Sequence, residues 1–201
     1  KEGEKKVSGA ARETVEELGR VLASSPDEGE KMDAAWRLGA LGSGEAVRCL
    51  AGALKGEQSP LVREAITGAL LGCEPRAVAE EMAALLKSGE ASAVSAAMEV
   101  LSACCSEDSL EVLERLLKDE DRDVRVSVVH TLGKGNCASG AELFRRVISE
   151  DEDVNVVAAA VEYLGEVGEE RDAELLRAAA ERFKDPFLSF TVRRALEMLE
   201  N

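Results

Sequence analysis

The chain has 201 residues, and its 40 acidic side chains outnumber the 25 basic ones to give a formal net charge of −15. This charge disfavours nucleic acid and anionic membranes as main ligands, because both are negatively charged themselves. The sequence contains no apolar run near the roughly 18 residues of a membrane span and begins without the apolar stretch of a secretory signal, so we expect a cytoplasmic protein.

Leucines recur along the whole chain at intervals of 32, 31, 31, 32 and 35 residues, at Leu38, Leu70, Leu101, Leu132, Leu164 and Leu199. A period of about 31 residues is typical of a repeat protein, in which one helix pair cannot bury its own apolar face and successive pairs must stack. We number the positions of each repeat as offsets, so that the repeat leucine lies at offset eight. Offset zero then falls on Glu30, Val62, Ala93, Val124, Val156 and Thr191.

The predicted elements form one repeat domain over residues 1–201. Residues 1–25 are expected to supply an N-terminal capping helix. Five helix-pair repeats follow at 26–56, 57–88, 89–119, 120–150 and 151–185, and residues 186–201 supply a C-terminal capping helix. We see no sign of strands, because no segment alternates apolar and polar residues.

The fourth repeat shows the pattern of one unit most clearly. At 100° per residue, one arc of its first helix is apolar at offsets 0, 4, 5 and 8, which are Val124, Val128, Val129 and Leu132. Gly133 and Gly135 are predicted to end this helix. A second amphipathic helix then presents an apolar face formed by Leu143, Phe144, Val147 and Ile148.

Prolines and acidic runs mark the predicted helix starts. Ser25-Pro26 is interpreted as an N-cap followed by the first helical residue, and Glu74-Pro75 and Asp185-Pro186 repeat this arrangement. The acidic links at 118–121 and 149–153 are predicted to be solvated caps that favour the positive N-terminus of the next helix.

The cysteines form an odd set without a Cys-x-x-Cys pair: Cys49, Cys73, Cys104, Cys105 and Cys137. This argues against a disulfide framework or a structural zinc site and favours a reducing compartment. Cys73 and Cys104 stand three residues after repeat leucines, where we expect them to be small buried hydrophobic residues.

Two segments carry a resemblance to a known family. Val124-Arg125 with Leu132-Gly133, and the run from Ala34 to Gly42, are similar to the short HEAT-like repeats of the phycobilin lyase type, known in many bacterial and archaeal proteins. The resemblance covers residues 28–201. With the periodicity, it implies an all-α fold, a right-handed α-solenoid (superhelix) of about twelve helices in stacked antiparallel pairs. It also implies that the first helices line the concave face and the second helices the convex face.

Offsets 2, 6 and 10 of each first helix point away from its buried arc and therefore into the expected hollow. The predicted partner-binding residues are Met32, Trp36, Glu64, Glu99, Val126, His130, Lys134, Glu162, Glu166 and Arg193. Trp36 is expected either to be an exposed interface anchor or to pack over the junction with the N-terminal capping helix. Phe187 and Phe190 leave the same two alternatives open near the other end.

Glu99, His130 and Glu162 fall on three successive first helices, and carboxylates beside an imidazole could bind a metal or act as an acid–base pair. A solvated polar column on a binding face is the favoured interpretation, because His130 is the only histidine of the chain. We therefore expect no catalytic residue, no metal and no cofactor.

The sequence predicts a non-catalytic scaffold or adaptor, not an enzyme. It would bind another protein, with a basic or mixed-charge surface, on the concave face, and neither nucleic acid nor membrane. The alternative is a phycobilin-lyase-like subunit or another enzyme accessory protein.

Overall fold

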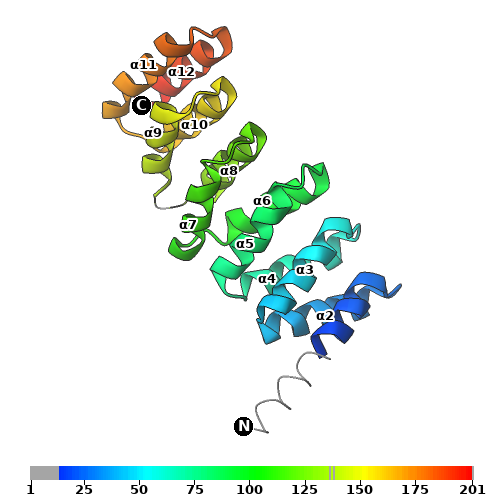
Figure 1. Cartoon of the computed structure of the whole chain (residues 1–201). Coiled ribbons are helices and arrows are strands. Elements are labelled where there is room, and N and C mark those ends of the chain that lie inside the picture. The colour runs from blue at the N-terminus through cyan, green and yellow to red at the C-terminus, as the bar shows by residue number, and fades with distance from the viewer. Residues whose placement is uncertain (1–13, 136, 138, 201) are drawn as a thin grey trace. The chain divides into compact units, whose positions relative to one another are not determined.

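The computed structural model describes residues 14–135, 137 and 139–200, and these contain twelve α-helices and no strand. The chain divides into two compact units, Lys1–Cys104 (unit 1) and Cys105–Asn201 (unit 2). Within each unit, the predicted all-α solenoid arrangement of stacked antiparallel helix pairs is confirmed (Figure 1). None of the helices in the described part of the chain is long and apolar enough to cross a membrane.

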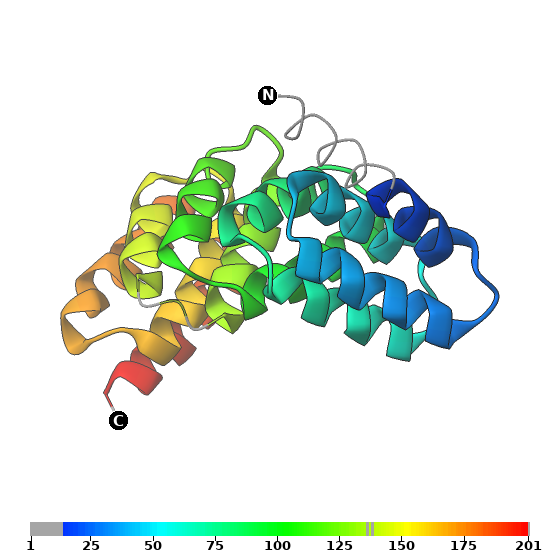
Figure 2. The same cartoon turned by 90° about the horizontal axis from the view of Figure 1, so that it is seen from below.

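The described part of unit 1 starts with a helical segment over residues 14–24, and residues 1–13 of the predicted N-terminal cap lie outside the described residues. Five helices follow: α2 (Glu28–Leu41), α3 (Gly44–Gly56), α4 (Pro60–Leu71), α5 (Pro75–Leu86) and α6 (Ala91–Ala103). The first helices of the repeats stack side by side, since α4 packs against both α2 and α6. The second helices α3 and α5 form a parallel row beside them, as Figure 2 shows. Leu38, Leu70 and Leu101 are fully buried between the rows.

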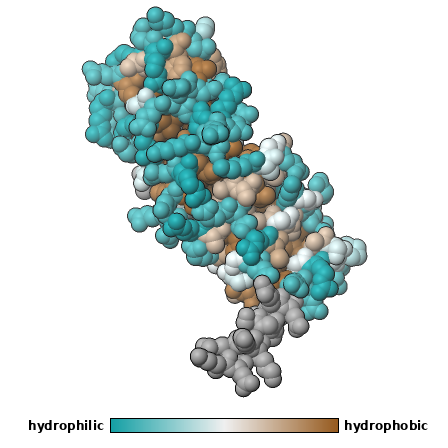
Figure 3. All heavy atoms as spheres, viewed as in Figure 1, coloured by the Kyte–Doolittle hydropathy of each residue, from teal (hydrophilic) through white to brown (hydrophobic). Residues whose placement is uncertain are grey.

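Unit 2 repeats this arrangement with α7 (Glu107–Leu116), α8 (Arg122–Lys134), α9 (Gly140–Glu150), α10 (Val154–Val167), the 3-10 turn η1 (Glu170–Asp172), α11 (Ala173–Phe183) and α12 (Pro186–Leu199). The first helix α10 packs against both α8 and α12, and the second helix α9 packs against α11. Leu132, Leu164 and Phe144 lie in the core. The visible side of this unit is predominantly hydrophilic in Figure 3.

Each first helix starts at the same position relative to its repeat. The N-cap residue lies three residues before offset zero in α2, α4, α6, α8 and α10, at Asp27, Ser59, Glu90, Asp121 and Asp153. The N-cap of α12 is Asp185, which places offset zero at Leu188. The predicted register of the last repeat is therefore wrong by three residues, and Leu196 instead of Leu199 occupies offset eight.

Most of the proline assignments hold, and one is wrong. Pro60, Pro75 and Pro186 occupy the first turn of α4, α5 and α12. Pro26 lies outside α2, whose N-cap is Asp27: its carboxylate accepts a hydrogen bond from the Glu30 amide at 2.9 Å. Asp27 is therefore the N-cap that the sequence assigned to Ser25, because its side chain reaches a backbone amide of the first helical turn.

The glycine at offset nine does not end the first helix, contrary to the prediction for Gly133, since α8 continues to Lys134. Its role is to let the next first helix approach closely. A Cβ atom at Gly165 would lie 2.8 Å from the Cα atom of Ala195 on α12, closer than two carbon atoms can pack. This contact explains why a Leu-Gly step recurs in the sequence.

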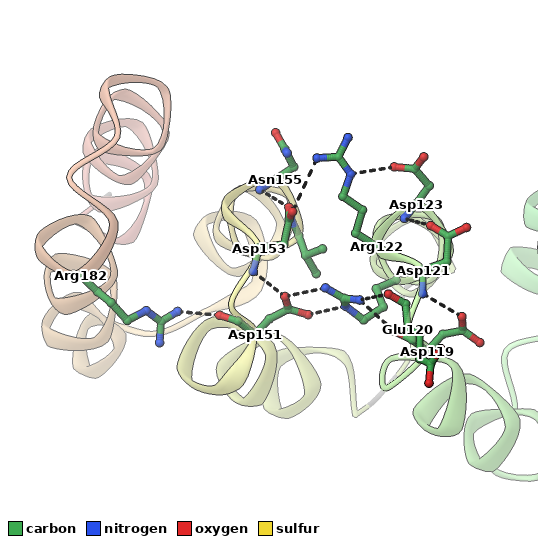
Figure 4. A network of polar contacts seen from close by, with 11 residues as sticks. Asp119, Glu120, Asp121, Arg122, Asp123, Asp151, Asp153, Asn155 and Arg182 are labelled. Carbon is green, nitrogen blue, oxygen red and sulfur yellow. Dashed lines mark hydrogen bonds and ion pairs between the residues drawn. The ribbon is translucent and has the colours of Figure 1, made fainter.

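The acidic links are more than the solvated caps that we predicted. Asp121 and Asp153 do cap α8 and α10, but the Asp151 carboxylate is largely buried in a two-pronged ion pair with Arg125, at 2.8 Å from Nε and 3.1 Å from Nη2. Arg182 donates to the backbone carbonyl of Asp151 at 3.0 Å, and Figure 4 shows Arg182 directed toward Asp151. Charge-assisted contacts thus join α8, the end of α9 and α11 within unit 2.

One cysteine prediction is wrong, because Cys105 and Cys137 form a disulfide with their Cα atoms 5.8 Å apart. Cys105 lies in the turn between α6 and α7, and Cys137 lies in the turn between α8 and α9. They are 32 residues apart, which is one repeat period. The odd cysteine count had hidden this pair. Cys73 is buried as expected, and burial raises the pKa of its thiol. Cys104, for which we also expected burial, is only half-buried.

Candidate functional site

In each unit, the outward positions at offsets 2 and 6 of the first helices form what we call the first-helix face. These positions avoid the apolar arc, so their side chains stay outside the core even though the helix beneath them is rigidly packed. The structure places Trp36 and Glu99 of unit 1, and Glu162 of unit 2, on this face with exposed side chains. Val126 and His130 are half-buried there.

Within unit 2 the first-helix face contains a groove of about 380 Å³ that spans α8, α10 and α12. We call it the unit 2 groove. Its floor is apolar and consists of Val126 on α8 and the small, buried residues Ala158 and Ala159 on α10. The alanines leave a depression because the neighbouring positions on α8 and α12 carry taller side chains.

Two aromatic side chains on α12 form one wall of the unit 2 groove. Phe187 is 64% exposed and Phe190 is 53% exposed, so neither packs into the core. The exposure of both rings is what an interface anchor requires, and that role stays a prediction. Exposed aromatic rings beside a concave apolar floor are the composition that protein interfaces favour.

Charged side chains lie at the rim of the unit 2 groove. Glu162 on α10 and Arg194 on α12 both line it, and both are exposed. Neither forms an ion pair or hydrogen bond with another residue in the described part of the chain, whereas Arg125 and Arg145 of the same unit are paired with carboxylates. The groove therefore offers one free carboxylate and one free guanidinium to a ligand.

His130 is held by a tyrosine and not by a carboxylate. Its Nδ1 atom lies 3.2 Å from the hydroxyl of Tyr163, whose ring stacks on Phe144 with 5.6 Å between the ring centroids. Burial and then the positive charge of Lys134 lower the pKa of His130, while Glu162 raises it, with a net lowering. The imidazole is therefore neutral at pH 7 and acts as a polar part of the groove wall.

Sequence reasoning missed Tyr163, which lies at offset seven, outside the column that we examined. A signal was present in Gly133: a Cβ atom there would collide with the Tyr163 ring, so this glycine marks the position where a bulky residue of the next helix lies. The glycine of the Leu-Gly step thus indicates that the offset-seven residue of the next first helix lies against it.

The metal or acid–base alternative receives no support from the placement of its residues. Glu99 belongs to unit 1, where its carboxylate lies 3.8 Å from Arg63, while His130 and Glu162 belong to unit 2. Among the described residues, no three His, Cys, Asp or Glu side chains are grouped so that they could hold a metal ion.

The predicted residues of unit 1 lie on the first helices α2, α4 and α6. Trp36 is 53% exposed and its ring lies over Gly68 on α4, where a Cβ atom would be 2.7 Å from the ring atom Cη2. The tryptophan thus packs along the first-helix face toward the next repeat. Of the other predicted residues, Glu64 on α4 is exposed and Met32 on α2 is half-buried. Leu61, 58% exposed and one residue before offset zero, was missed.

Three predicted residues of unit 2 lie outside the groove. Lys134 and Glu166 are exposed at offset ten, beyond its lining, and Arg193 is exposed but does not contribute to it. With the corrected register of α12, offsets 2 and 6 are Phe190 and Arg194, and both line the groove. These two residues replace Arg193 on the predicted surface.

A second hollow of about 350 Å³ lies between α7, α8 and α9, lined by Lys118, Arg125, Arg146 and Asp151 among others. Both of its arginines are engaged in ion pairs: Arg125 with Asp151, and Arg146 with Glu114 at 3.0 Å. We assign this hollow to the packing of the repeats.

Comparison with known proteins supports the fold assignment. The family model of HEAT repeats matches residues 112–197, and the resemblance seen in the sequence is confirmed over this part of the chain. No curated protein matches the sequence.

Similar chains are found among solved structures. Human deoxyhypusine hydroxylase in complex with glycerol is 16% identical, with a TM-score of 0.48, and 96% of this chain and 98% of that chain are covered. A designed armadillo repeat protein in complex with the peptide (KR)4 is 15% identical, with a TM-score of 0.39 and coverage of 91% and 98%. An engineered protein is 19% identical, with a TM-score of 0.40 and coverage of 92% and 96%.

Proposed function

We propose that this protein is a non-catalytic scaffold or adaptor that binds a partner protein on the first-helix face. A repeat solenoid is consistent with such a role, because stacked units present an extended surface for interaction. The unit 2 groove is the single observation that carries the proposal. It combines an apolar floor, two exposed phenylalanines and unpaired charges on the side of the helices that the core does not use.

The proposal includes the charge of the partner. A chain with a formal net charge of −15 attracts a basic or mixed-charge surface and repels nucleic acid and anionic membranes. Association with such a partner should slow as salt is added, because exposed charges more than about 8 Å apart are screened at physiological ionic strength.

No enzymatic step is part of the proposal. A general base must reach the proton that it removes, and the most suggestive side chain of the groove, His130, has its Nδ1 atom engaged with the Tyr163 hydroxyl. The support for a binding role is that the groove combines apolar, aromatic and charged side chains from different helices, as a surface that recognises a partner does.

The test compares two sets of alanine variants of the full chain as bait in affinity purification from the source cell, with bound proteins quantified by mass spectrometry. Trp36→Ala and Phe190→Ala alter the first-helix face, whereas Arg177→Ala and Glu181→Ala alter exposed positions on α11. We expect the Trp36→Ala and Phe190→Ala variants to lose a bound protein that the two α11 variants retain. All four variants should melt at the temperature of the wild type. Loss of binding in the α11 variants alone would refute it.

A further inference from the structure

The unit 2 groove is specific enough in its chemistry to define the segment that it binds. Resting on the proposed function, we infer that it takes a short extended peptide segment of the partner, in which a large apolar residue lies near one basic and one acidic residue. The apolar residue enters the depression over Ala158, the basic residue contacts Glu162 and the acidic residue contacts Arg194.

The depression fits a large apolar side chain. Ala158 and Ala159 are only 4% and 7% exposed, so the floor is closed and apolar. Phe187 and Phe190 stand beside it and keep more than half of their surface in contact with solvent. Covering these rings with a leucine or aromatic side chain removes apolar surface from water on both partners, and ring pairs add a directional contribution.

The two charges call for a mixed-charge segment. Glu162 and Arg194 both occupy offset six, on the adjacent helices α10 and α12, and both line the groove without forming an ion pair with each other. A uniformly basic segment would satisfy Glu162 but place like charge against Arg194, and a uniformly acidic one would do the reverse. Only a segment with both signs satisfies both groups.

The spacing of the charges follows from the helix packing. Adjacent packed helices lie about 8–10 Å apart. An extended chain advances about 3.3 Å per residue, so a segment that crosses from α10 to α12 places its basic and acidic residues about three positions apart. The apolar residue falls on or beside the stretch between them.

The probe for a test is a phage-displayed library of random dodecapeptides, selected on the intact protein at low ionic strength. The inference expects enriched peptides with a large apolar residue, a Lys or Arg, and an Asp or Glu about three positions from it. A synthetic copy of one such peptide, labelled with fluorescein, then reports affinity by anisotropy.

The variants separate the three contacts. Phe190→Ala should weaken the peptide at least tenfold. Glu162→Lys should also weaken it, and replacing the basic residue of the peptide by Glu should restore affinity. Arg194→Glu should be rescued by the reciprocal change in the peptide. Arg177→Glu and Glu181→Lys on α11 are the matched charge controls and should leave the dissociation constant within twofold.

Each other result overturns the inference in a recognisable way. If selected peptides show no charge pattern, or if the reversals at Glu162 and Arg194 have no effect, the mixed-charge segment is wrong. If Trp36→Ala abolishes peptide binding while Phe190→Ala does not, the proposed function stands and this inference fails. If only the α11 variants lose binding, both fail. A homodimer that Phe190→Ala dissociates would identify a second copy as the occupant instead.

Discussion

At offset nine of a first helix, the distance to the neighbouring helix decides whether a side chain can be present. A Cβ atom at Gly165 would lie 2.8 Å from the Ala195 backbone, and one at Gly39 would lie 2.9 Å from the Ala69 Cβ atom. The neighbouring backbone cannot move aside as the end of a flexible side chain can. The two glycines are thus required by packing, although both lie inside helices where glycine is unfavourable.

Gly165→Ala should therefore lower the free energy of unfolding by about 1–3 kcal/mol, the usual cost of overpacking a core. The matched control is Gly52→Ala on α3, where a Cβ atom meets nothing within 4 Å. That change should raise stability by about 0.5–1 kcal/mol, because alanine is the better helix former. Urea unfolding followed by circular dichroism measures both. Shifts of the same sign would contradict the close-approach explanation.

The repeat leucines give a second prediction at this scale. Leu101 is fully buried and Leu132 is 1% exposed, as their position at offset eight predicts. Replacing either by alanine should destabilise its unit by about 2–5 kcal/mol through lost burial and the cavity left behind. Leu71→Ala is the control, since Leu71 is 43% exposed, and thermal melts of the three variants give the comparison. Melts of Leu101→Ala and Leu132→Ala that match the wild type would refute the repeat alignment.

At the scale of elements, ion pairs connect α2, α8 and α9 each to a residue 26 or 27 positions further along the chain, which is almost one repeat. The Arg145 side chain on α9 contacts Asp172, at the end of η1, through bonds of 2.7 Å from Nε and 2.9 Å from Nη2. In unit 1, Lys31 contacts Glu57 at 2.7 Å in the same way. Because the Asp172 carboxylate that it holds is almost fully buried, Arg145 is a structural residue of unit 2.

Arg145→Ala should cost about 3 kcal/mol at pH 7, at the lower end for a buried pair because 19% of the Arg145 side chain stays exposed. The Arg145 guanidinium lowers the pKa of Asp172 in the folded state. The stabilisation is therefore complete above the unfolded pKa of about 3.9 and disappears as the pH falls through the lower folded pKa. Urea unfolding of the wild type and of Arg145→Ala from pH 7 to about pH 2 should show the difference between their free energies of unfolding shrinking below about pH 4. A difference that stays constant would exclude the carboxylate as its cause.

The sequence was sufficient to predict the helix pairs, the repeat period and the outward columns, because the 3.6-residue periodicity is a local property of each helix. The last repeat failed for an equally local reason: Leu196 and Leu199 are both leucines three residues apart, and leucine spacing alone cannot choose between them. The cap at Asp185, in line with the earlier caps, would have chosen correctly. Pairings such as that of Arg145 with Asp172 depend on side-chain directions across two helices and have no local signature.

At the scale of the whole molecule, the groove and the charge act over different distances. The charge of −15 belongs to the chain and influences any partner before contact, while the apolar groove acts only once the partner touches α10 and α12. We expect added salt to reduce the association rate more than it increases the dissociation rate, because exposed charges steer encounter and buried apolar contacts resist separation.

The Cys105–Cys137 disulfide lies within unit 2 and spans 32 residues, so its removal should affect one unit more than the other. Closing a loop of this length restricts the unfolded chain, which the chain-entropy account values at about 3–4 kcal/mol. In a repeat protein each helix pair depends mainly on its neighbours, so the loss should be greatest around the bridged turns.

Dithiothreitol should accordingly increase amide hydrogen exchange in α9 while leaving α3 of unit 1 unchanged, measured by mass spectrometry of peptic peptides. Trp36, the chain's single tryptophan, provides an independent urea-unfolding signal from unit 1 that should not shift. A Cys105→Ala and Cys137→Ala double variant should match the reduced protein and ignore the reductant, while Cys49→Ala, which alters a free thiol, should respond as the wild type does. Equal loss of protection in α3 and α9 would mean that the chain unfolds as one cooperative body, and no loss in α9 would mean that the bridge does not stabilise unit 2.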